Sequence, residues 1–238
     1  MYISTYIIIL VAIQMTCTLA SVPLKCFLQN YPFLNLFTNF SVPVSTYDAY
    51  KISSLQLDPV RLDTFHLDRD GLRLDTKDLE YIGLNDAIVD EFGLNLKSNV
   101  SRLIFHFDLS GKGQYKVEGT LFSKPINGQG TIFLNLKNVK VDMTMPFNMI
   151  LDANGNRVIN FKGFYYWHDI SDEAEFNLSN LYDGDKEKSD IMHYLINQNW
   201  RSFTQQFGKP YMDKIFGHAF NVIKNQILLM PLRNLDSC

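Results

Sequence analysis

The stretch from Thr131 to Leu151 reads TIFLNLKNVKVDMTMPFNMIL and alternates apolar with polar side chains. A period of two is typical of a β-strand with one face on an apolar core and the other face in water. The stretch therefore predicts a long antiparallel strand in a sheet that is covered on one side. Its apolar positions are Ile132, Leu134, Leu136, Val141, Met143, Met145, Phe147, Met149 and Leu151.

The same period extends outward from this stretch in both directions. Toward the N-terminus it recurs in the ranges 60–67, 72–74, 92–96, 103–109 and 115–121. Toward the C-terminus, Asn154-Gly155 has the residues of a tight hairpin turn. We expect Ile159 to Trp167 to form one return strand, with Gly163 as a bulge, and the range 174–178 to close the series. Glycines inside these strands predict a strongly bent sheet.

A helical period replaces the alternation after about Lys186. Apolar residues then recur at intervals of three and four as far as Phe207, which predicts a helix about 30 Å long at roughly 1.5 Å per residue. Asp183 and Asp185 lie where an N-cap residue is expected. Gly208-Lys209-Pro210 is expected to stop or kink the helix, and the pattern resumes as far as Ile227. Because a bent sheet must bury its apolar face, we expect this helix to cover it.

Composition excludes some classes of function. The chain has 238 residues and a formal net charge of −3, so it lacks the basic surface that nucleic-acid binding requires. No metal-ligand spacing, catalytic elbow or phosphate-binding loop is found, which argues against an enzyme, a metal site and a cofactor. The histidines are expected to be scattered surface or hydrogen-bonded residues: His66, His106, His168, His193 and His218.

The N-terminus predicts an extracellular protein. Residues 1–20 hold a short apolar run before Thr18-Leu19-Ala20, the pattern of a cleaved secretory signal. An uncleaved membrane anchor is the alternative, but the run is shorter than the ~20 residues of a membrane span. We expect residues 21–54 to form an arm or short helix, residues 55–238 to form one domain, and no stable membrane insertion. Glycosylation sequons begin at Asn39, Asn99 and Asn177.

Two cysteines remain after such a cleavage, Cys26 and Cys238. They can pair in an oxidising compartment, or they can be a free thiol and a terminal residue. Sequence does not decide between these alternatives, because it does not give the distance between their Cα atoms.

Several short stretches resemble one known family. Their order and spacing, from about Leu57 to Leu229, are similar to those of the takeout / juvenile-hormone-binding-protein family of insects. The stretches are Leu57-Asp58-Pro59-Val60, Tyr81-Ile82-Gly83-Leu84, Tyr115 to Gly119, Pro125 to Gly130, Leu136-Lys137-Asn138-Val139, Leu178 to Asp185 and Asn197-Gln198-Asn199-Trp200-Arg201.

This resemblance implies an α+β fold in which a highly curved antiparallel sheet wraps a long C-terminal helix, a TULIP-like super-roll with an internal hydrophobic tunnel. It also implies a secreted carrier for a juvenile-hormone-like terpenoid or a fatty-acid-like ligand, with links to feeding, hormone or circadian physiology. One departure concerns the N-terminal end of the tunnel. Members of the family carry two nearby cysteines there, and only Cys26 matches.

We expect apolar side chains of the sheet and helix to line the tunnel of a monomeric carrier, with Tyr115 giving one polar contact to the ligand. A lipid-transfer or membrane-surface interaction protein is the alternative reading. The expected lining residues are Leu103, Phe105, Phe107, Tyr115, Ile132, Leu134, Val141, Met143, Met145, Phe147, Trp200 and Phe203.

Overall fold

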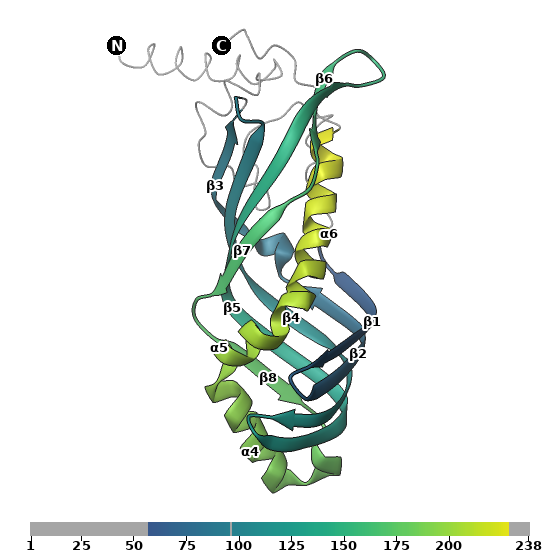
Figure 1. Ribbon diagram of the computed structural model, residues 1–238, viewed down its shortest axis with the longest axis vertical. Coiled ribbons are helices and arrows are strands. Elements are labelled where there is room, and N and C mark those ends of the chain that lie inside the picture. The colour runs from purple at the N-terminus through teal and green to yellow at the C-terminus, as the bar shows by residue number, and fades with distance from the viewer. Residues whose placement is uncertain (1–56, 96, 229–238) are drawn as a thin grey trace, which may run out of the picture.

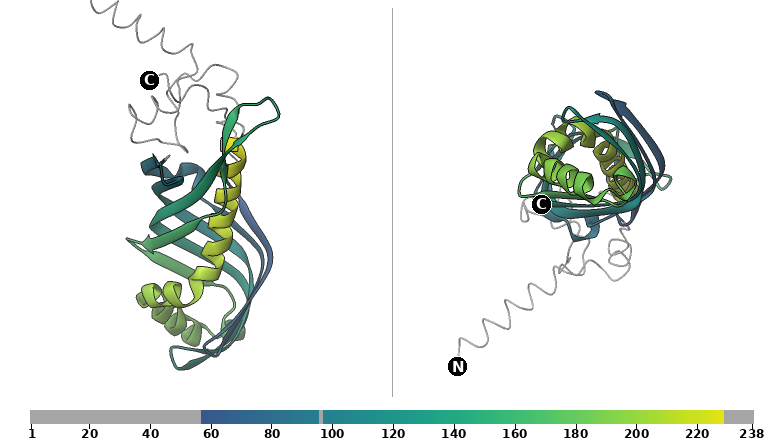
Figure 2. Two further views of the ribbon diagram at one scale, coloured as in Figure 1. Left: turned by 45° about the horizontal axis from the view of Figure 1, so that its top comes forward. Right: turned by 90° about the horizontal axis from the view of Figure 1, so that it is seen from below.

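One antiparallel sheet curls around a helical segment in the computed structural model, which describes residues 57–95 and 97–228 (Figure 1). Viewed from below, the strands surround much of the helical part (Figure 2). The strand order is β1-β2-β4-β5-β6, with β3 beside β4, and with β7 and β8 also paired to β5. The sheet stays open, because β1 forms one edge and β6, β7 and β8 lie beyond β5. The predicted α+β architecture is confirmed.

The elements follow the expected order along the chain. The strands are β1 Val60–Arg69, β2 Leu72–Ile82, β3 Ile88–Asn95, β4 Val100–Leu121, β5 Lys124–Leu151, β6 Arg157–Phe161, β7 Tyr165–Ile170 and β8 Ala174–Leu178. The helices are η1 Leu84–Asp86, η2 Tyr182–Gly184, α4 Lys186–Gln198, α5 Trp200–Phe203, the π-helical η3 Thr204–Gly208 and α6 Lys209–Leu228.

Strands β4 and β5 form the spine of the sheet. They pair from Val100 opposite Pro146 to Leu121 opposite Lys124. The alternating ranges 103–109 and 115–121, which look like two runs in the sequence, belong to one strand of 22 residues. Gly111 and Gly113 occupy inward positions between the two runs, so the strand continues although the apolar side chains are interrupted.

A register shift in the spine changes which residues face inward. The shift lies between Phe107 and Leu109 on β4, opposite Asn138 of β5, whose φ is 54°. The backbone N–H of Asn138 donates to the Asp108 carboxylate at 2.9 Å, and the Lys137 ammonium lies 2.7 Å from the same carboxylate. This ion pair and hydrogen bond hold the pKa of Asp108 below its usual range. Even-numbered residues of β5 therefore face inward before the shift, and odd-numbered residues after it.

The return after the Asn154-Gly155 turn differs from the prediction of one bulged strand. Chain 157–170 forms two strands, β6 and β7, and Gly163 lies between them. Strand β6 pairs with the end of β5 near Phe147, whereas β7 pairs with the middle of β5 near Val141. The gap between the two strands therefore moves the chain along β5, which a single bulge would not do.

The helical part is interrupted earlier than predicted. Of the two aspartates expected at the N-cap, Asp185 caps α4, because its carboxylate accepts a hydrogen bond from the Lys188 N–H at 3.2 Å. Asp183 lies in η2 instead. The helix expected to reach Phe207 instead ends at Gln198, where Asn199 leaves the helical conformation. The Asn199 Nδ2 donates to the Leu195 carbonyl at 2.8 Å and so satisfies one of the last carbonyls of α4.

The helical part does not stop at Gly208-Lys209-Pro210, where the sequence predicts a stop or a kink. A π-helical segment leads directly into α6 at this point. Pro210 is the second residue of α6 and follows the π-helical segment directly. The chain is therefore helical on both sides of Gly208.

Two polar side chains from the sequence stretches quoted above join elements that lie apart along the chain. The Asp58 carboxylate accepts hydrogen bonds from the backbone N–H groups of Gly83, Leu84 and Asn85 at 2.9, 3.0 and 2.9 Å. The Asn197 amide both accepts from the Phe176 N–H at 2.8 Å and donates to the Phe176 carbonyl at 3.1 Å. The Asp58 hydrogen bonds fix the chain at the end of β2, and the Asn197 hydrogen bonds fix α4 against β8.

Helix α6 bridges the two open sides of the sheet. On the β1–β2 side, the ring of Tyr211 lies 4.6 Å from that of Phe65. On the β7 side, the Tyr166 hydroxyl donates to the Asp213 carboxylate at 2.5 Å. The helix thus spans the space between β1–β2 and β7. In the described part of the chain, this and every other helix lacks the length and apolar character to cross a membrane.

Candidate functional site

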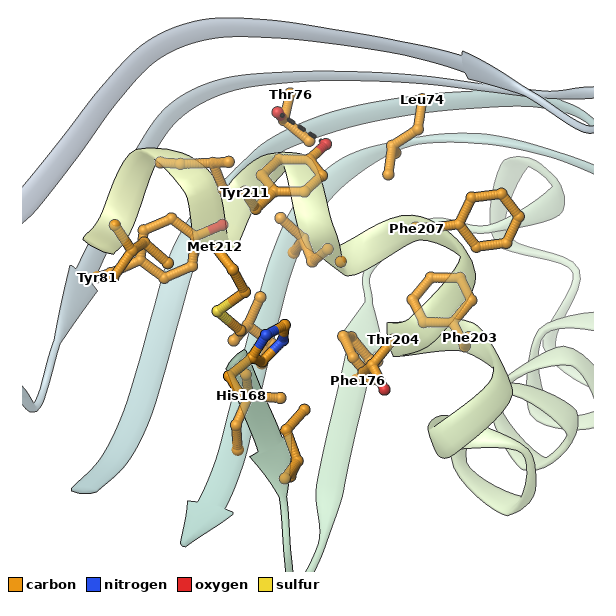
Figure 3. A pocket seen from close by; sticks show the side chains of 17 residues that line it. Leu74, Thr76, Tyr81, His168, Phe176, Phe203, Thr204, Phe207, Tyr211 and Met212 are labelled. Carbon is orange, nitrogen blue, oxygen red and sulfur yellow. Dashed lines mark hydrogen bonds between the residues drawn. The ribbon is translucent and has the colours of Figure 1, made fainter. Parts of the chain in front are cut away.

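A cavity lies between the inner face of the sheet and the segment from α5 to α6 (Figure 3). Its empty space, including the open mouth, is about 660 Å³. The wall is mostly aliphatic and aromatic. The lining residues are Leu74, Thr76, Leu79, Tyr81, Ile132, Leu134, Leu136, His168, Ile170, Phe176, Phe203, Thr204, Phe207, Gly208, Tyr211, Met212 and Ile215.

The sheet side of the cavity is built from one row of residues across the strands. Tyr81 of β2 pairs with Gly111 of β4, which pairs with Leu134 of β5, which pairs with Phe176 of β8. A Cβ atom at Gly111 would lie 2.8 Å from two carbons of the Tyr81 ring. The absence of a side chain at Gly111 therefore lets this ring lie across β4. Gly113 does the same for Leu79, because a Cβ there would lie 2.6 Å from a Leu79 methyl carbon.

The helix side combines bulky rings with small residues. Phe203 packs edge-on against Phe176 at 4.9 Å between ring centroids and lies 5.3 Å from Phe207. These rings form one end of the cavity wall (Figure 3). Thr204 and Gly208, in the π-helical segment, place little volume in the space beside them. A π-helical turn in a long helix is frequently found at a functional site.

Five polar side chains lie in the otherwise apolar wall: Thr76, Tyr81, His168, Thr204 and Tyr211. The hydroxyls of Thr76 and Tyr211 are 3.4 Å apart. Burial raises the pKa of Tyr211 to about 12. Burial also raises the pKa of Tyr81 far above its ordinary value and lowers the pKa of His168. These directions keep Tyr81, His168 and Tyr211 uncharged at neutral pH, and the two threonine hydroxyls carry no charge.

His168 differs from the surface or hydrogen-bonded residue expected from sequence. Its ring is half-buried against the rings of Tyr166 and Phe216, at 5.7 and 5.8 Å between centroids. Burial is the main cause of its lowered pKa, opposed by the Asp169 and Asp213 carboxylates and reinforced by the Lys209 ammonium. Among the described residues, no hydrogen-bond partner contacts either ring nitrogen.

The other histidines within the described ranges vary. His66 and His106 each lie beside a carboxylate, at 2.7 Å from Asp75 and 2.8 Å from Asp90. His193 accepts the Leu178 N–H at 3.0 Å. His218 Nε2 is buried without a partner among the described residues. The described residues also contain no group of three His, Cys, Asp or Glu side chains that could hold a metal ion.

The expected lining residues fall into two groups. Ile132, Leu134 and Phe203 line the cavity. The aliphatic and aromatic residues expected on β4 and on the later part of β5 are buried in the core instead, where the rings of α6 pack on them. They are Leu103, Phe105, Phe107, Val141, Met143, Met145 and Phe147. That a ligand reaches these residues stays a prediction.

Tyr115 and Trp200 also lie apart from this cavity wall. The Tyr115 hydroxyl donates to the Ser179 carbonyl at 2.7 Å, so its O–H is already used within the protein. Burial raises the Tyr115 pKa to about 12. The half-buried Trp200 ring carries the Arg201 guanidinium at 4.3 Å. The polar contact that sequence reasoning assigned to Tyr115 therefore has better candidates in Tyr81, Tyr211 and His168.

Sequence reasoning missed most of the residues that β2 and the helical part contribute to the cavity wall. Tyr81 was noted only as part of a family stretch, and Phe207 only as part of a helical period. One signal was available. Gly111 and Gly113 alternate within a strand at inward positions, where missing side chains leave room for neighbours to fold across the backbone.

Only two of the other predicted sites, Asn99 and Asn177, lie within the described residues. Asn99 and Asn177 are exposed, at the β3–β4 turn and on β8. Asn39, Cys26, Cys238, the signal segment 1–20 and the arm 21–54 lie outside the described residues.

Comparison with known proteins places this architecture in one family. The family model for haemolymph juvenile hormone binding protein (JHBP) matches residues 46–232, most of the chain. The crystal structure of Takeout 1 from Epiphyas postvittana superposes with a TM-score of 0.71 at 35% identity, covering 74% of this chain and 82% of that one.

A curated relative is also similar in sequence. The circadian clock-controlled protein daywake of Drosophila melanogaster is 21% identical over 179 residues, which cover 70% of this chain and 68% of daywake. The family match and the Takeout 1 superposition agree with the fold and with the order of the sequence stretches. The chain therefore belongs to the haemolymph juvenile hormone binding protein family.

Proposed function

We propose that this chain is a secreted carrier that holds one small apolar ligand in the cavity between the sheet and α6. The observation that carries the proposal is the cavity itself, about 660 Å³ with its mouth and lined almost entirely by apolar side chains. Such a space stays poorly hydrated, so an apolar molecule is a better occupant than water. Membership of a family named for juvenile hormone binding supports a terpenoid or fatty-acid-like ligand.

Burial of the ligand supplies the binding free energy. A ligand that buries about 300 Å² of apolar surface gains roughly 7 kcal/mol at about 25 cal/mol per Å². The entropy lost on association reduces that figure, so a closely fitting wall matters. Met212 supports adaptation to varied shapes, because its flexible thioether lies in the lining.

The proposal includes secretion and a single ligand-binding domain. A signal segment at 1–20, an arm at 21–54 and a domain at 55–238 form the expected organisation. Exposed sequon asparagines at Asn99 and Asn177 support an extracellular address. The similarity to daywake, a protein named for circadian control, supports a role in daily or hormonal physiology.

A fluorescence displacement assay with N-phenyl-1-naphthylamine tests the proposal. The full chain should take up the probe and release it to an unlabelled terpenoid or fatty-acid ester. Leu134→Trp places a large ring in the cavity and should weaken probe binding by at least about tenfold. Phe133→Trp is the matched control, because Phe133 is the neighbouring residue on the exposed outer face of β5. The control should change binding less than about twofold.

Two results would contradict the carrier function. One is the absence of probe uptake by the folded wild-type chain. The other is firm sedimentation with anionic vesicles without any uptake of apolar ligand, which is the behaviour of a membrane-surface protein.

A further inference from the structure

Phe133 is an aromatic side chain on the outer face of β5, and its side chain is 44% exposed. The residues two positions away on the same face, Thr131 and Asn135, are polar, so the ring lies in polar surroundings along its own strand. A single exposed apolar side chain is common on a protein surface and needs no explanation of its own. The significance of this one comes from its neighbours on the adjacent strands.

The neighbours of Phe133 across the sheet are charged on one side and begin a glycosylation sequon on the other. Phe133 pairs with Lys112 of β4 and with Asn177 of β8. The Lys112 ammonium lies 5.6 Å from the ring centroid, so it approaches the ring from the β4 side. The next strand partner is Glu80 of β2, whose carboxylate is paired with Arg61 at 3.0 Å. On the β8 side, the residue opposite the ring is Asn177.

Strand β8 holds the sequon Asn177-Leu178-Ser179 firmly in place. The Ser179 N–H donates to the Thr131 carbonyl at 2.9 Å, and the Ser179 hydroxyl oxygen accepts the Thr131 N–H at 2.8 Å. The other edge of β8 is held by the Asn197 amide, through its two hydrogen bonds to the Phe176 backbone. The exposed Asn177 side chain is therefore presented on the outer face at a fixed position beside Phe133.

A sugar attached to Asn177 suits the surface beside it. Directly opposite residues of antiparallel strands have Cβ atoms about 4.5–5.5 Å apart, so a sugar on the Asn177 amide nitrogen begins within reach of the Phe133 ring. One face of the N-acetylglucosamine ring consists of C–H groups, which can pack on the negatively polarised face of an aromatic ring. This contact removes apolar surface of both partners from water, while the sugar hydroxyls at the rim stay hydrated.

We propose that Asn177 carries an N-linked glycan whose first N-acetylglucosamine packs on the Phe133 ring and stabilises β8 against β5. In the attachment step, the Asn177 amide nitrogen forms a bond to C1 of the sugar and gives up one proton. The bond from C1 to the oxygen of a lipid diphosphate carrier breaks. The inference rests on the secretion included in the proposed function, because this modification belongs to secreted proteins.

The glycan supports the cavity wall from outside. Strand β8 presents Asn177 on its outer face and Phe176 on its inner face, where Phe176 lines the cavity. Holding β8 on β5 therefore also holds Phe176 in the wall. Because the glycan and the cavity lie on opposite faces of the sheet, the glycan touches no ligand.

Secretion of the full chain from insect cells tests the modification. The secreted protein is mapped by glycopeptide mass spectrometry, and its thermal unfolding is compared with that of Asn177→Gln. The wild type should carry a glycan at Asn177 and unfold about 1–4 °C above the variant, the shift expected for one favourable cross-strand contact. With glycans kept in the high-mannose form by kifunensine, trimming to the first N-acetylglucosamine by endoglycosidase H should preserve this difference.

Two controls separate the contact with the sugar from the substitution itself. In the unglycosylated chain made in bacteria, Asn177→Gln should change the Tm by less than about 1 °C, because an exposed amide replaces an exposed amide. In the secreted Phe133→Thr chain the aromatic ring is absent, so Asn177→Gln should again change the Tm by less than about 1 °C.

The outcomes separate this inference from the proposed function. A chain that is not secreted would overturn the proposed secretion, and the glycan with it. A secreted chain with Asn177 unmodified, or an effect of Asn177→Gln that persists in Phe133→Thr, would overturn the inference and leave secretion standing. Absence of N-phenyl-1-naphthylamine uptake by the secreted wild type would overturn the carrier function alone.

Discussion

Replacement of Gly111 by alanine tests how the cavity wall is built. The new Cβ would lie 2.8 Å from Cδ1 and Cε1 of Tyr81 and 3.0 Å from Cγ of Leu134. Carbon atoms prefer separations of about 3.5–4.0 Å, so the ring must move by roughly 0.7 Å. Overpacking of this kind costs about 1–3 kcal/mol, and the stiffer alanine backbone offsets about 0.4–1 kcal/mol.

The expected net loss is about 1–2 kcal/mol, or a fall in Tm of about 2–8 °C for a domain of this size. Urea and thermal unfolding of the full chain measure it. Gly93→Ala is the control, because a Cβ at Gly93 of β3 meets nothing within 4 Å. It should leave stability unchanged or slightly raised.

A second substitution isolates the contact with the tyrosine ring. In a Tyr81→Leu background the aromatic carbons are absent, so Gly111→Ala should cost about 1 kcal/mol less than in the wild type. The contact with Leu134 remains in both backgrounds. An equal effect of Gly111→Ala and Gly93→Ala, or an unchanged cost in the Tyr81→Leu background, would refute the reasoning.

Three further substitutions test the Asp58 and Asn197 hydrogen bonds and the dependence of stability on pH. Asp58→Ala leaves three backbone N–H groups without their carboxylate. It should lower the free energy of unfolding by about 2 kcal/mol, whereas the exposed Asp63→Ala should change it by less than about 0.5 kcal/mol. Asn197→Ala removes both hydrogen bonds to the Phe176 backbone. It should lower the free energy of unfolding by about 1–2 kcal/mol in the same urea titration. An unchanged midpoint would contradict the role of Asn197 in holding α4 against β8. The pKa of His168 is lowered in the native state, so the unfolded chain binds more protons. Stability should therefore fall as the pH drops from about 6.5 through that lowered pKa. His168→Gln should flatten this part of the curve of urea midpoint against pH, and an identical curve would count against the assignment.

The sheet was largely predictable because alternation records which face of a strand is buried. The stretch Thr131 to Leu151 forms most of β5, and most of its apolar residues face the core on both sides of the register shift. The end of α4 was not predicted, because Asn199 was read as a helical residue. An asparagine side chain can close a helix C-terminus, and here it bonds to the Leu195 carbonyl.

The position of the cavity was the harder problem. Phe107 and Leu134 both occupy inward positions of alternating strands, so their sequence contexts look equivalent. The difference comes from the opposite layer. Phe216 of α6 packs edge-on against Phe107 at 6.4 Å between ring centroids. The π-helical segment η3 instead contributes the small residues Thr204 and Gly208 to the cavity that Leu134 lines. Which inward side chains face a space depends on pairing across layers, and a single strand does not encode that pairing.

Photo-crosslinking with an uncharged long-chain ester that carries a diazirine tests most directly whether the cavity holds the ligand. The full chain is irradiated with the probe, digested and mapped by mass spectrometry. The account predicts one probe per chain, with adducts on lining residues of β2, β5 and the η3–α6 segment, and loss of these adducts in Leu134→Trp. Adducts confined to outward-facing residues such as Phe133 and Trp167, or labelling that Leu134→Trp leaves unchanged, would contradict it.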